Sequence, residues 1–224
     1  MLRLISLVPS VTETLSAWDR TPVACTRFCE RDDLAHVGGT KNPAIDEIVA
    51  LAPDLVIVDA EENRREDYDE LVARGLDVHV LHVRDLGDVG PALASLALRV
   101  DVAWTEPTLV AGTPVRRSAL VPIWRRPWMV LGTPTYGASL LEHLGVRTLT
   151  GTAGPYPTVS LDDAIACGAD LVIAPSEPYP FGERQRPELE RIAPTVFVDG
   201  KDLFWWGVRT PSAIERLAEQ FASL

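Results

Sequence analysis

One stretch of this chain occurs twice, and the repeat constrains the fold more than any other feature of the sequence. Residues 46–58 read Asp-Glu-Ile-Val-Ala-Leu-Ala-Pro-Asp-Leu-Val-Ile-Val, and residues 162–174, placed 116 positions later, read Asp-Asp-Ala-Ile-Ala-Cys-Gly-Ala-Asp-Leu-Val-Ile-Ala. Each copy predicts a helix that begins with acidic residues, a tight turn that ends in Asp, and a short apolar strand. The repeat therefore predicts two similar α/β halves rather than one sheet with an appended tail.

The similarity extends on both sides of the repeated stretch. Upstream, a strand and a Pro-Ser turn in residues 4–10 are echoed by residues 130–135, and downstream, residues 71–80 are echoed by residues 189–198. Residues 55–58 are continuously apolar, which is typical of a strand in a parallel sheet that is covered on both faces. Because strands and helices alternate with short connections, we expect each half to be a doubly wound lobe.

The sequence divides into three predicted parts. Residues 1–84 form an N-terminal α/β lobe, residues 85–117 a bridging helix and loop, and residues 118–224 a C-terminal α/β lobe. In the bridge, apolar residues recur at helical spacing between Asp88 and about Trp104. The remainder of the bridge contains two prolines and a glycine, so we expect it to be irregular.

Charge and length exclude several classes of partner. The 224 residues carry a net charge of −11, which argues against binding to nucleic acid or to an anionic membrane surface. No segment is long enough to span a membrane, and the apolar run at the N-terminus is too short for a secretory signal. The three cysteines lack the spacing of metal ligands. As written, the sequence predicts a cytoplasmic monomer that does not insert into a membrane.

Aromatic residues are concentrated at expected strand ends of the second half. The lobe opens with a strand expected from Ser118 to Trp124, and Trp128 follows closely. In open α/β sheets ligands bind beyond the carboxyl ends of the strands. The run Trp205-Trp206-Gly207 is more typical of a ligand platform than of a core, although core packing is the alternative.

Other side chains favour the same binding surface. Arg125 and Arg126 lie between two tryptophans, and their guanidinium groups can stack on rings or bind a carboxylate or phosphate. A solvated basic loop is the alternative interpretation of this segment. Tyr156 lies between two prolines, which present it stiffly, and Arg209 follows the tryptophan pair. We therefore expect a pocket with aromatic walls and arginines.

No pattern requires catalysis or a directly bound metal ion. His79 and His82 are three residues apart on an expected strand, so their side chains point to opposite faces. We find no His, carboxylate or Cys cluster with metal-ligand spacing and no Gly-x-Ser-x-Gly motif. We predict that the protein is not an enzyme, that it has no catalytic residue or metal site, and that it has no intrinsic cofactor.

Several short motifs together resemble a known family. They are the opening strand with Pro9-Ser10, the Val37-Gly38-Gly39 turn, residues 51–57, and residues 156–162. The chain resembles the helical-backbone (class III) substrate-binding proteins of ABC importers and is most similar to their cobalamin-binding branch, whose relatives take up ferric siderophores and haem. The resemblance covers essentially the whole chain.

The resemblance implies a periplasmic-binding-protein-like fold, in which a single backbone helix bridges two α/β lobes and a ligand is clamped in the cleft. Large flat macrocycles need aromatic area more than hydrogen bonds, which agrees with the pocket expected from the residues. The residues that the resemblance and the aromatic pattern assign to the ligand are Phe28, Cys29, Trp124, Arg125, Trp128, Tyr156, Trp205, Trp206 and Arg209.

The resemblance also implies a permease partner and a compartment. In such proteins an acidic residue on each lobe docks to arginines of the permease. Asp162 lies at the expected position of the second lobe, and Glu61, Glu62 and Glu66 lie near the expected position of the first. Members of the family are usually periplasmic or anchored at the cell surface.

We therefore predict a non-catalytic solute-binding protein that clamps a metal-bearing macrocycle between two lobes, with cobalamin or another corrinoid as the first candidate. A ferric siderophore or haem is the alternative ligand, since arginines suit the anionic groups of either. An enzyme of cofactor metabolism that reuses this fold is the alternative from another class. A third alternative is a protein-interaction module that binds no small molecule.

Overall fold

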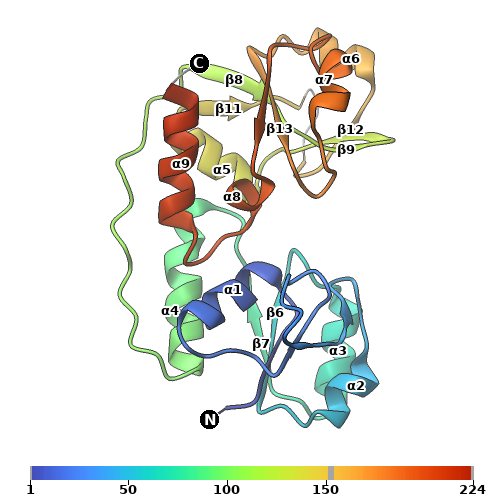
Figure 1. Ribbon diagram of the computed structural model, residues 1–224, viewed down its shortest axis with the longest axis vertical. Helices are drawn as coiled ribbons and strands as arrows, with labels where there is room; N and C mark the ends of the chain where they lie inside the picture. Colours follow the sequence, from blue (N-terminus) through green and yellow to red (C-terminus); the bar gives the residue numbers. More distant parts are fainter. Residues whose placement is uncertain (1, 151–153, 223–224) are drawn as a thin grey trace. The chain divides into compact units, whose positions relative to one another are not determined.

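The computed structural model describes residues 2–150 and 154–222 and consists of two compact α/β units (Figure 1). Both units contain parallel sheets with helices packed beside them, so the predicted fold class is confirmed. Unit 1 comprises Met1–Val83, Gly87–Pro107 and Trp206–Arg209, and unit 2 comprises Arg84–Leu86, Thr108–Trp205 and Thr210–Leu224. In the described part of the chain no helix is both long enough and apolar enough to cross a membrane.

Unit 1 is built on a parallel sheet whose strand order is β3-β2-β1-β6-β7. The strands are β1 (Leu4–Ser6), β2 (Ala24–Cys25), β3 (Ala35–His36), β6 (Leu55–Asp59) and β7 (Val78–Leu81), and a hairpin of β4 (Gly38–Gly39) and β5 (Asn42–Pro43) follows β3. All five residues of β6 are buried, which explains the continuous apolar run in the sequence.

The helices of unit 1 cover this sheet. They are α1 (Pro9–Ala17), α2 (Ile45–Ala50), α3 (Arg65–Ala73) and α4 (Val89–Arg99), the last preceded by the 3₁₀ turn η1 (Leu86–Asp88). Helix α4, the expected bridge, groups with unit 1 and ends five residues before Trp104. It stops there because Asp101 adopts a positive φ of 53°, which a right-handed helix cannot continue through. Residues 102–116 form no helix or strand, as the prolines and glycine predicted.

Unit 2 contains a parallel sheet of order β11-β8-β13-β14 and a separate antiparallel sheet of order β12-β10-β9. The strands of the parallel sheet are β8 (Arg117–Leu120), β11 (Val146–Thr148), β13 (Leu171–Pro175) and β14 (Thr195–Val198). Those of the antiparallel sheet are β9 (Pro122–Arg125), β10 (Trp128–Val130) and β12 (Thr158–Val159). The helices are α5 (Tyr136–His143), α6 (Leu161–Ala166), η2 (Glu183–Gln185), α7 (Arg186–Leu189), α8 (Gly200–Phe204) and α9 (Thr210–Ala222).

The central repeat of the sequence is reproduced in the structure. Helices α2 and α6 both have six residues, strands β6 and β13 both have five, and the two pairs keep the offset of 116 positions. The turns also match, because Ala52 (φ 45°) and the corresponding Gly168 (φ 69°) are both left-handed. Downstream, β7 pairs with β6 as β14 pairs with β13, so this extension of the repeat is confirmed.

The upstream extension of the repeat was wrong for the strand. Strand β1 lies between β2 and β6, and its counterpart between β11 and β13 is β8, not the segment at residues 130–135. That segment follows β10, which belongs to an antiparallel insertion. The single strand expected from Ser118 to Trp124 is also two strands, since the chain leaves the parallel sheet after Leu120 and enters the antiparallel sheet at Pro122. A continuous apolar run gave no sign of this change of sheet.

Candidate functional site

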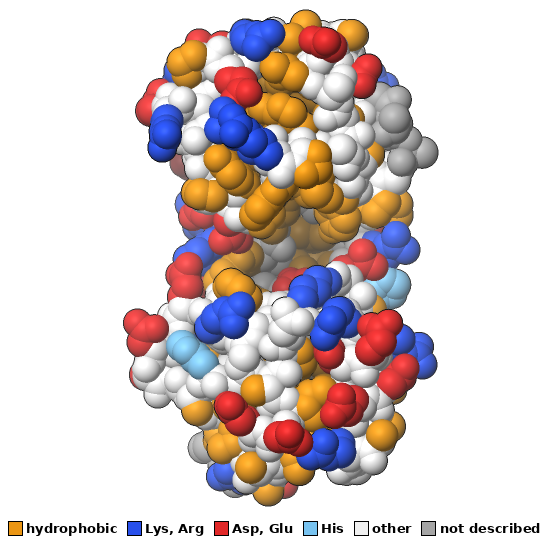
Figure 2. Space-filling view, turned by 90° about the vertical axis from the view of Figure 1, so that its right-hand side faces the viewer, with side chains coloured by type: hydrophobic (Ala, Val, Ile, Leu, Met, Phe, Trp, Pro, Cys, Tyr) orange, Lys and Arg blue, Asp and Glu red, His pale blue; other side chains and the backbone are white. Residues whose placement is uncertain are grey.

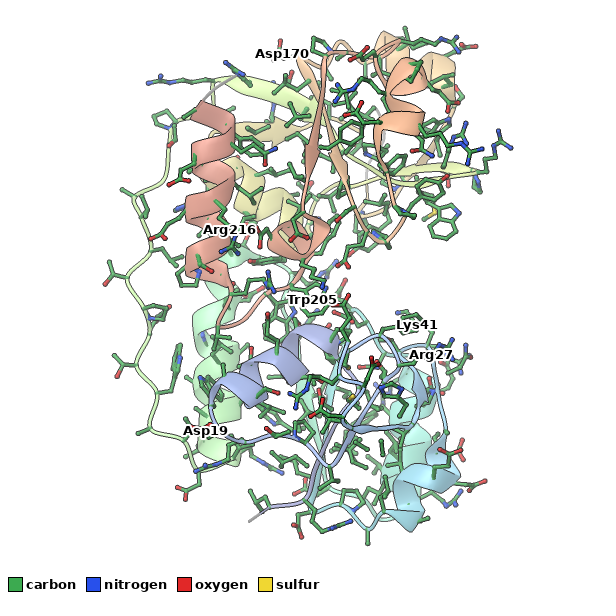
Figure 3. The ribbon with its side chains drawn as sticks, viewed as in Figure 1. Asp19, Arg27, Lys41, Asp170, Trp205 and Arg216 are labelled. Carbon is green, nitrogen blue, oxygen red and sulfur yellow. The ribbon has the colours of Figure 1, made fainter. Side chains whose placement is uncertain are left out.

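The carboxyl ends of the parallel strands define one functional edge in unit 1. Because these strands are parallel, the loops that follow them meet at a single edge of the sheet, where ligands bind in open α/β folds. Arg27 and Phe28 follow β2, the turn of Lys41 follows β3 and β4, and the loop after Asp59 follows β6. The side chains of this edge are drawn in Figure 3.

Arg27 and Phe28 form a flat exposed surface, here called the Arg27–Phe28 platform. The Phe28 ring is 51% exposed, and the carbon of the Arg27 guanidinium lies 4.8 Å from the ring centroid. Gly39 lies against both, since a Cβ there would be 3.1 Å from Phe28 Cε2 and 3.2 Å from Arg27 Nη2. The Arg27 amide donates a 3.0 Å hydrogen bond to the Gly38 carbonyl. The hairpin of β4 and β5 therefore holds the platform in place.

Cys29, which was assigned to the ligand, directly follows the platform residues and is buried. The residue is 5% exposed, and its Sγ is 3.2 Å from Thr12 Oγ1 and 3.3 Å from Thr26 Oγ1. Its neighbour Cys25 is fully buried, and a hydrogen bond to Cys29 together with burial raises the pKa of Cys25. The Cys29 side chain therefore packs among polar groups inside the turn, and its assignment as a ligand contact stays a prediction.

A buried carboxylate ends β6 at the same edge. Asp59 is 1% exposed, and its Oδ1 accepts hydrogen bonds from the amides of Glu61 (2.8 Å) and Glu62 (3.2 Å). Burial raises the pKa of Asp59 to about 6. Asn63 completes the loop, since its Oδ1 accepts from the Asp59 amide at 2.8 Å and its amide group donates to the Thr40 carbonyl at 2.9 Å. These bonds fix the backbone that carries Glu61 and Glu62.

The acidic residues assigned to permease docking fall into two groups. Glu61 and Glu62 are half-buried, and Glu61 Oε1 lies 3.1 Å from Nε2 of His82. Glu66 and Asp162 are exposed, and each is the second residue of its helix, α3 and α6 respectively. Carboxylates in the first turn of a helix are favoured by the helix dipole, so their positions also have a local structural reason.

The antiparallel sheet of unit 2 turns its two tryptophans to opposite faces. Trp124 is paired with Met129 and Trp128 with Arg125, and directly paired residues share a face. Trp124 is 44% exposed, whereas Trp128 stacks on Phe181 with a centroid distance of 6.1 Å and an interplanar angle of 7°. Trp128 therefore contributes mainly to the interior of unit 2, where it packs beside Val172 and Leu189.

Arg125 shares the inward face with Trp128 and is already paired. Its Nη2 lies 2.6 Å and its Nε 2.8 Å from Oε2 of Glu188, and the hydrogen bond to Glu188 raises the pKa of Arg125. The segment between the tryptophans is thus not one basic aromatic patch, as the sequence suggested. Strand pairing separates Trp124 on one face from Arg125 and Trp128 on the other.

Two aromatic residues of this region were missed by the sequence analysis. The Tyr179 ring meets Trp124 edge-on at 5.7 Å and lies 4.7 Å from the Phe181 ring. Both follow the carboxyl end of β13, and the run Tyr179-Pro180-Phe181 after a buried apolar strand was the signal that could have indicated them. Tyr156, which was predicted, directly precedes β12 and is 43% exposed. Hydrophobic side chains also gather along one edge of unit 2, the upper half of Figure 2.

The two residues of the expected tryptophan platform, Trp205 and Trp206, fall in different units. The segment before them is helix α8, which begins because Asp199 accepts a 2.9 Å hydrogen bond from the Lys201 amide. Trp205 is half-buried in unit 2 with the Lys201 ammonium 5.1 Å from its ring centroid. Trp206 groups with unit 1 and is 3% exposed, and its assignment to the ligand stays a prediction. Gly207 explains the burial, because a Cβ there would meet Thr14 of α1.

Arg209 belongs to unit 1 and pairs with an acid of α1. Its Nε donates to Oε2 of Glu13 at 2.9 Å, and its Nη2 donates to Oε1 of the same carboxylate. A bidentate pair of this kind fixes the planar guanidinium. Arg209 therefore anchors the chain to α1, and a ligand would have to compete with Glu13 for it. Among the residues that the structure describes, no group of three or more His, Cys, Asp and Glu could hold a metal ion.

Comparisons with known proteins give a clear result for the fold. No family model matches the chain, and no curated protein matches its sequence. Solved structures do match, among them the periplasmic heme-binding protein BhuT in complex with two hemes, with a TM-score of 0.80 and 19% identity over 99% of this chain and 98% of that chain. The periplasmic vitamin B12 binding protein BtuF of Vibrio cholerae matches with a TM-score of 0.77 and 17% identity over 99% and 96%. A periplasmic heme binding protein from Pseudomonas aeruginosa matches with a TM-score of 0.78 and 20% identity over 98% and 92%.

The chain therefore has the fold of the periplasmic binding proteins that serve ABC importers, and the predicted resemblance is confirmed at the level of the fold. The matches extend over nearly the full length of each chain, so both units take part in the similarity. The three named neighbours bind two different macrocycles, haem and vitamin B12. At identities of 20% or less, the fold does not select between these ligands.

Proposed function

We propose that this protein is a non-catalytic solute-binding protein for a flat, metal-bearing macrocycle, with a corrinoid as the first candidate and haem or a ferric siderophore as alternatives. The observation that carries the proposal is the exposure of large aromatic side chains in both units. Phe28 is 51% exposed in unit 1, and Trp124 and Tyr156 are 44% and 43% exposed in unit 2. Exposed aromatic area costs solvation free energy, and ligand binding recovers it.

The surroundings of these rings favour binding over catalysis. Phe28 is stacked with a guanidinium, and Trp124 rests on the edge of another ring, so both surfaces are held before a ligand arrives. Surfaces that are rigid in advance lose less side-chain entropy on binding. Asp59, the carboxyl group with a raised pKa at the edge of unit 1, accepts hydrogen bonds from two backbone amides with Oδ1, and its Oδ2 is buried without a hydrogen-bond partner among the described residues. Because Asp59 is only 1% exposed, it does not present a proton-transfer group to a bound substrate.

Tryptophan fluorescence tests this function. The protein is titrated with cyanocobalamin, haemin and a ferric siderophore, with correction for inner-filter absorption. We expect saturable quenching by at least one of the three and a loss of affinity of about fivefold or more in Trp124→Ala and Phe28→Ala, since a buried aromatic contact contributes about 1–3 kcal/mol. Trp104→Ala, which changes a half-buried tryptophan of the irregular segment, is the matched control and should bind normally.

Each outcome of the titration has a defined meaning. Saturable quenching by the corrinoid alone supports the first candidate. Saturable quenching by haemin or the siderophore instead moves the ligand assignment and keeps the receptor. If none of the three ligands gives a saturable signal, the proposal of a macrocycle receptor is wrong.

We further propose that Glu66 and Asp162 are the residues that dock to a permease, as the resemblance implies. Both carboxylates are exposed, whereas Glu61 and Glu62 are half-buried in a loop that Asp59 organises. Charge reversal in Glu66→Lys and Asp162→Lys should abolish stimulation of the importer's ATPase by the loaded protein and leave ligand affinity unchanged. Glu70→Lys, at another exposed acid of α3, is the control. Normal stimulation by both reversal variants would contradict the docking assignment.

A further inference from the structure

We propose that unit 1 recognises an anionic substituent of the ligand, a carboxylate or a phosphate, with Arg27 and Lys41, while Phe28 contacts the flat face of the macrocycle. The inference rests on the proposed function and names the chemical group that distinguishes a good ligand from a poor one. It concerns the hairpin of β4 and β5 together with the Arg27–Phe28 platform.

Arg27 differs from most arginines of unit 1 in its partners. The unit's other paired arginines are Arg31, Arg64, Arg65, Arg74, Arg99 and Arg209, and each is within 4 Å of a carboxylate. Across residues 2–150 and 154–222, no ion pair to Arg27 is found, and its side chain lies instead against Phe28 and Gly39. In a protein with a net charge of −11, a guanidinium that remains without a carboxylate is available for an external anion.

Stacking prepares Arg27 for this role. A guanidinium that covers an aromatic ring uses its flat face for the contact and keeps its N–H donors at its edge. Gly39 supports the arrangement, because any larger side chain would press on both Arg27 and Phe28. The donors are thus oriented before binding, beside a ring that is 51% exposed. The platform therefore combines an anion-binding edge with an aromatic face.

Lys41 supplies a second cation at the same end of the unit. It is exposed in the two-residue turn between β4 and β5, and its Nζ donates to the Glu61 carbonyl at 3.1 Å. Gly39, which contacts Arg27, is two residues before it. Figure 3 shows Arg27 and Lys41 at the same edge of unit 1, and Lys and Arg side chains also gather near one end of that unit in the lower half of Figure 2. Because the Glu61 carbonyl is neutral, this hydrogen bond does not neutralise the charge of the Lys41 ammonium group.

Pairs of analogues with and without the anionic group test the inference. Cyanocobalamin carries a nucleotide phosphate that dicyanocobinamide lacks, and haemin carries two propionates that its dimethyl ester masks. The affinity of each analogue is measured by calorimetry for the wild type, Arg27→Gln, Lys41→Gln and the double variant. We expect Arg27→Gln to lower the affinity for the analogue that carries the anionic group about tenfold, and the double variant to lower it further. The analogue that lacks this group should bind all four proteins equally well.

The control and the salt dependence sharpen the test. Arg65→Gln removes another exposed arginine of unit 1, one that pairs with Asp69, and it should leave both affinities unchanged. Raising the ionic strength should weaken binding of the analogue that carries the anionic group to the wild type more than to the double variant. The ligand pair that shows the difference identifies the anion as phosphate or carboxylate.

Three results would overturn the inference. Unchanged affinity of the double variant for a ligand that carries the anionic group would remove the anion site and leave the proposed function intact. An equal loss for analogues with and without this group would mean that Arg27 only supports the Phe28 ring. If no macrocycle binds the wild type, both the inference and the proposed function are wrong.

Discussion

The two units share one arrangement of helix and strand but differ at the edge formed by the carboxyl ends of their parallel strands. In unit 1 the edge consists of short loops with a charged aromatic platform, and β6 ends in the buried carboxylate of Asp59. In unit 2 the corresponding strand β13 ends in Pro175, and an added antiparallel sheet carries Trp124. The buried framework is therefore repeated, while the loops after the strands have diverged.

This difference indicates that residues inside the sheet and residues beyond the strand ends are under different structural requirements. Residues that pack the sheet keep the same apolar character in both copies, because in each unit an equivalent helix must cover an equivalent strand. Residues beyond the strand ends are free of that requirement, so unit 1 presents a cation beside a ring and unit 2 presents a cluster of rings.

Equivalent substitutions in the cores of the two units should give the largest change in the free energy of unfolding. Ile57 and Ile173 occupy matching positions of β6 and β13, and both are fully buried. We expect Ile57→Ala and Ile173→Ala each to lower the free energy of unfolding by about 2–5 kcal/mol. Urea denaturation measures the loss, and hydrogen exchange locates it in unit 1 or unit 2. A cost below about 1 kcal/mol in either variant would show that the two frameworks are not equivalent.

Replacing each of the two tryptophans of the antiparallel sheet should lower stability by different amounts, as the strand pairing predicts. Trp128 stacks on Phe181 inside unit 2, so Trp128→Ala should destabilise the protein by about 3 kcal/mol. Trp124 is 44% exposed, and Trp124→Ala should cost about 1 kcal/mol or less. Thermal unfolding of the two variants side by side provides the measurement. Equal losses would mean that both rings belong to the core.

The carboxylate of Asp59 predicts a pH dependence that has no counterpart at Pro175. Burial raises its pKa to about 6 from an ordinary value of 3.8, so the folded protein holds a proton that the unfolded chain has released between those pH values. Stability from this group is present below about pH 4 and is lost as the pH rises through about 6. Relative to the wild type, Asp59→Asn should therefore gain on the order of 2–3 kcal/mol between pH 4 and pH 7.5.

Urea denaturation at several pH values measures this change. The comparison uses the difference between Asp59→Asn and the wild type, which removes contributions from all other titrating groups. A difference that stays constant from pH 4 to pH 7.5 would contradict the raised pKa of Asp59.

The matching turns give the smallest expected effect. Gly168 and Ala52 both have left-handed backbone, which costs about 1 kcal/mol for a residue with a Cβ. Gly168→Ala should therefore destabilise unit 2 by about 1 kcal/mol, and Ala52→Gly should stabilise unit 1 by less, because glycine adds entropy to the unfolded chain. Chemical denaturation of both variants checks the opposite signs. Two changes of the same sign would show that the turns differ.

Local patterns predicted the framework but not the surface. Helices α2 and α6 and the strands after them were predictable, since acidic starts and apolar runs act within a dozen residues. The division of the strand near Val121 was not, because both sheets accept the same apolar residues. The inward orientation of Trp128 depends on its pairing with β9, and the burial of Trp206 depends on Gly207 packing on α1. These contacts join distant segments and leave no local signal.

The central proposal is that the exposed aromatic surface of each unit contacts the macrocycle. Hydrogen–deuterium exchange, with and without a saturating macrocycle from the fluorescence titration, tests it most directly. We predict slower exchange in residues 26–42 of unit 1 and in residues 122–130 of unit 2, with strands β6 and β13 unchanged. Protection of only one of the two segments, or of neither, would contradict the claim.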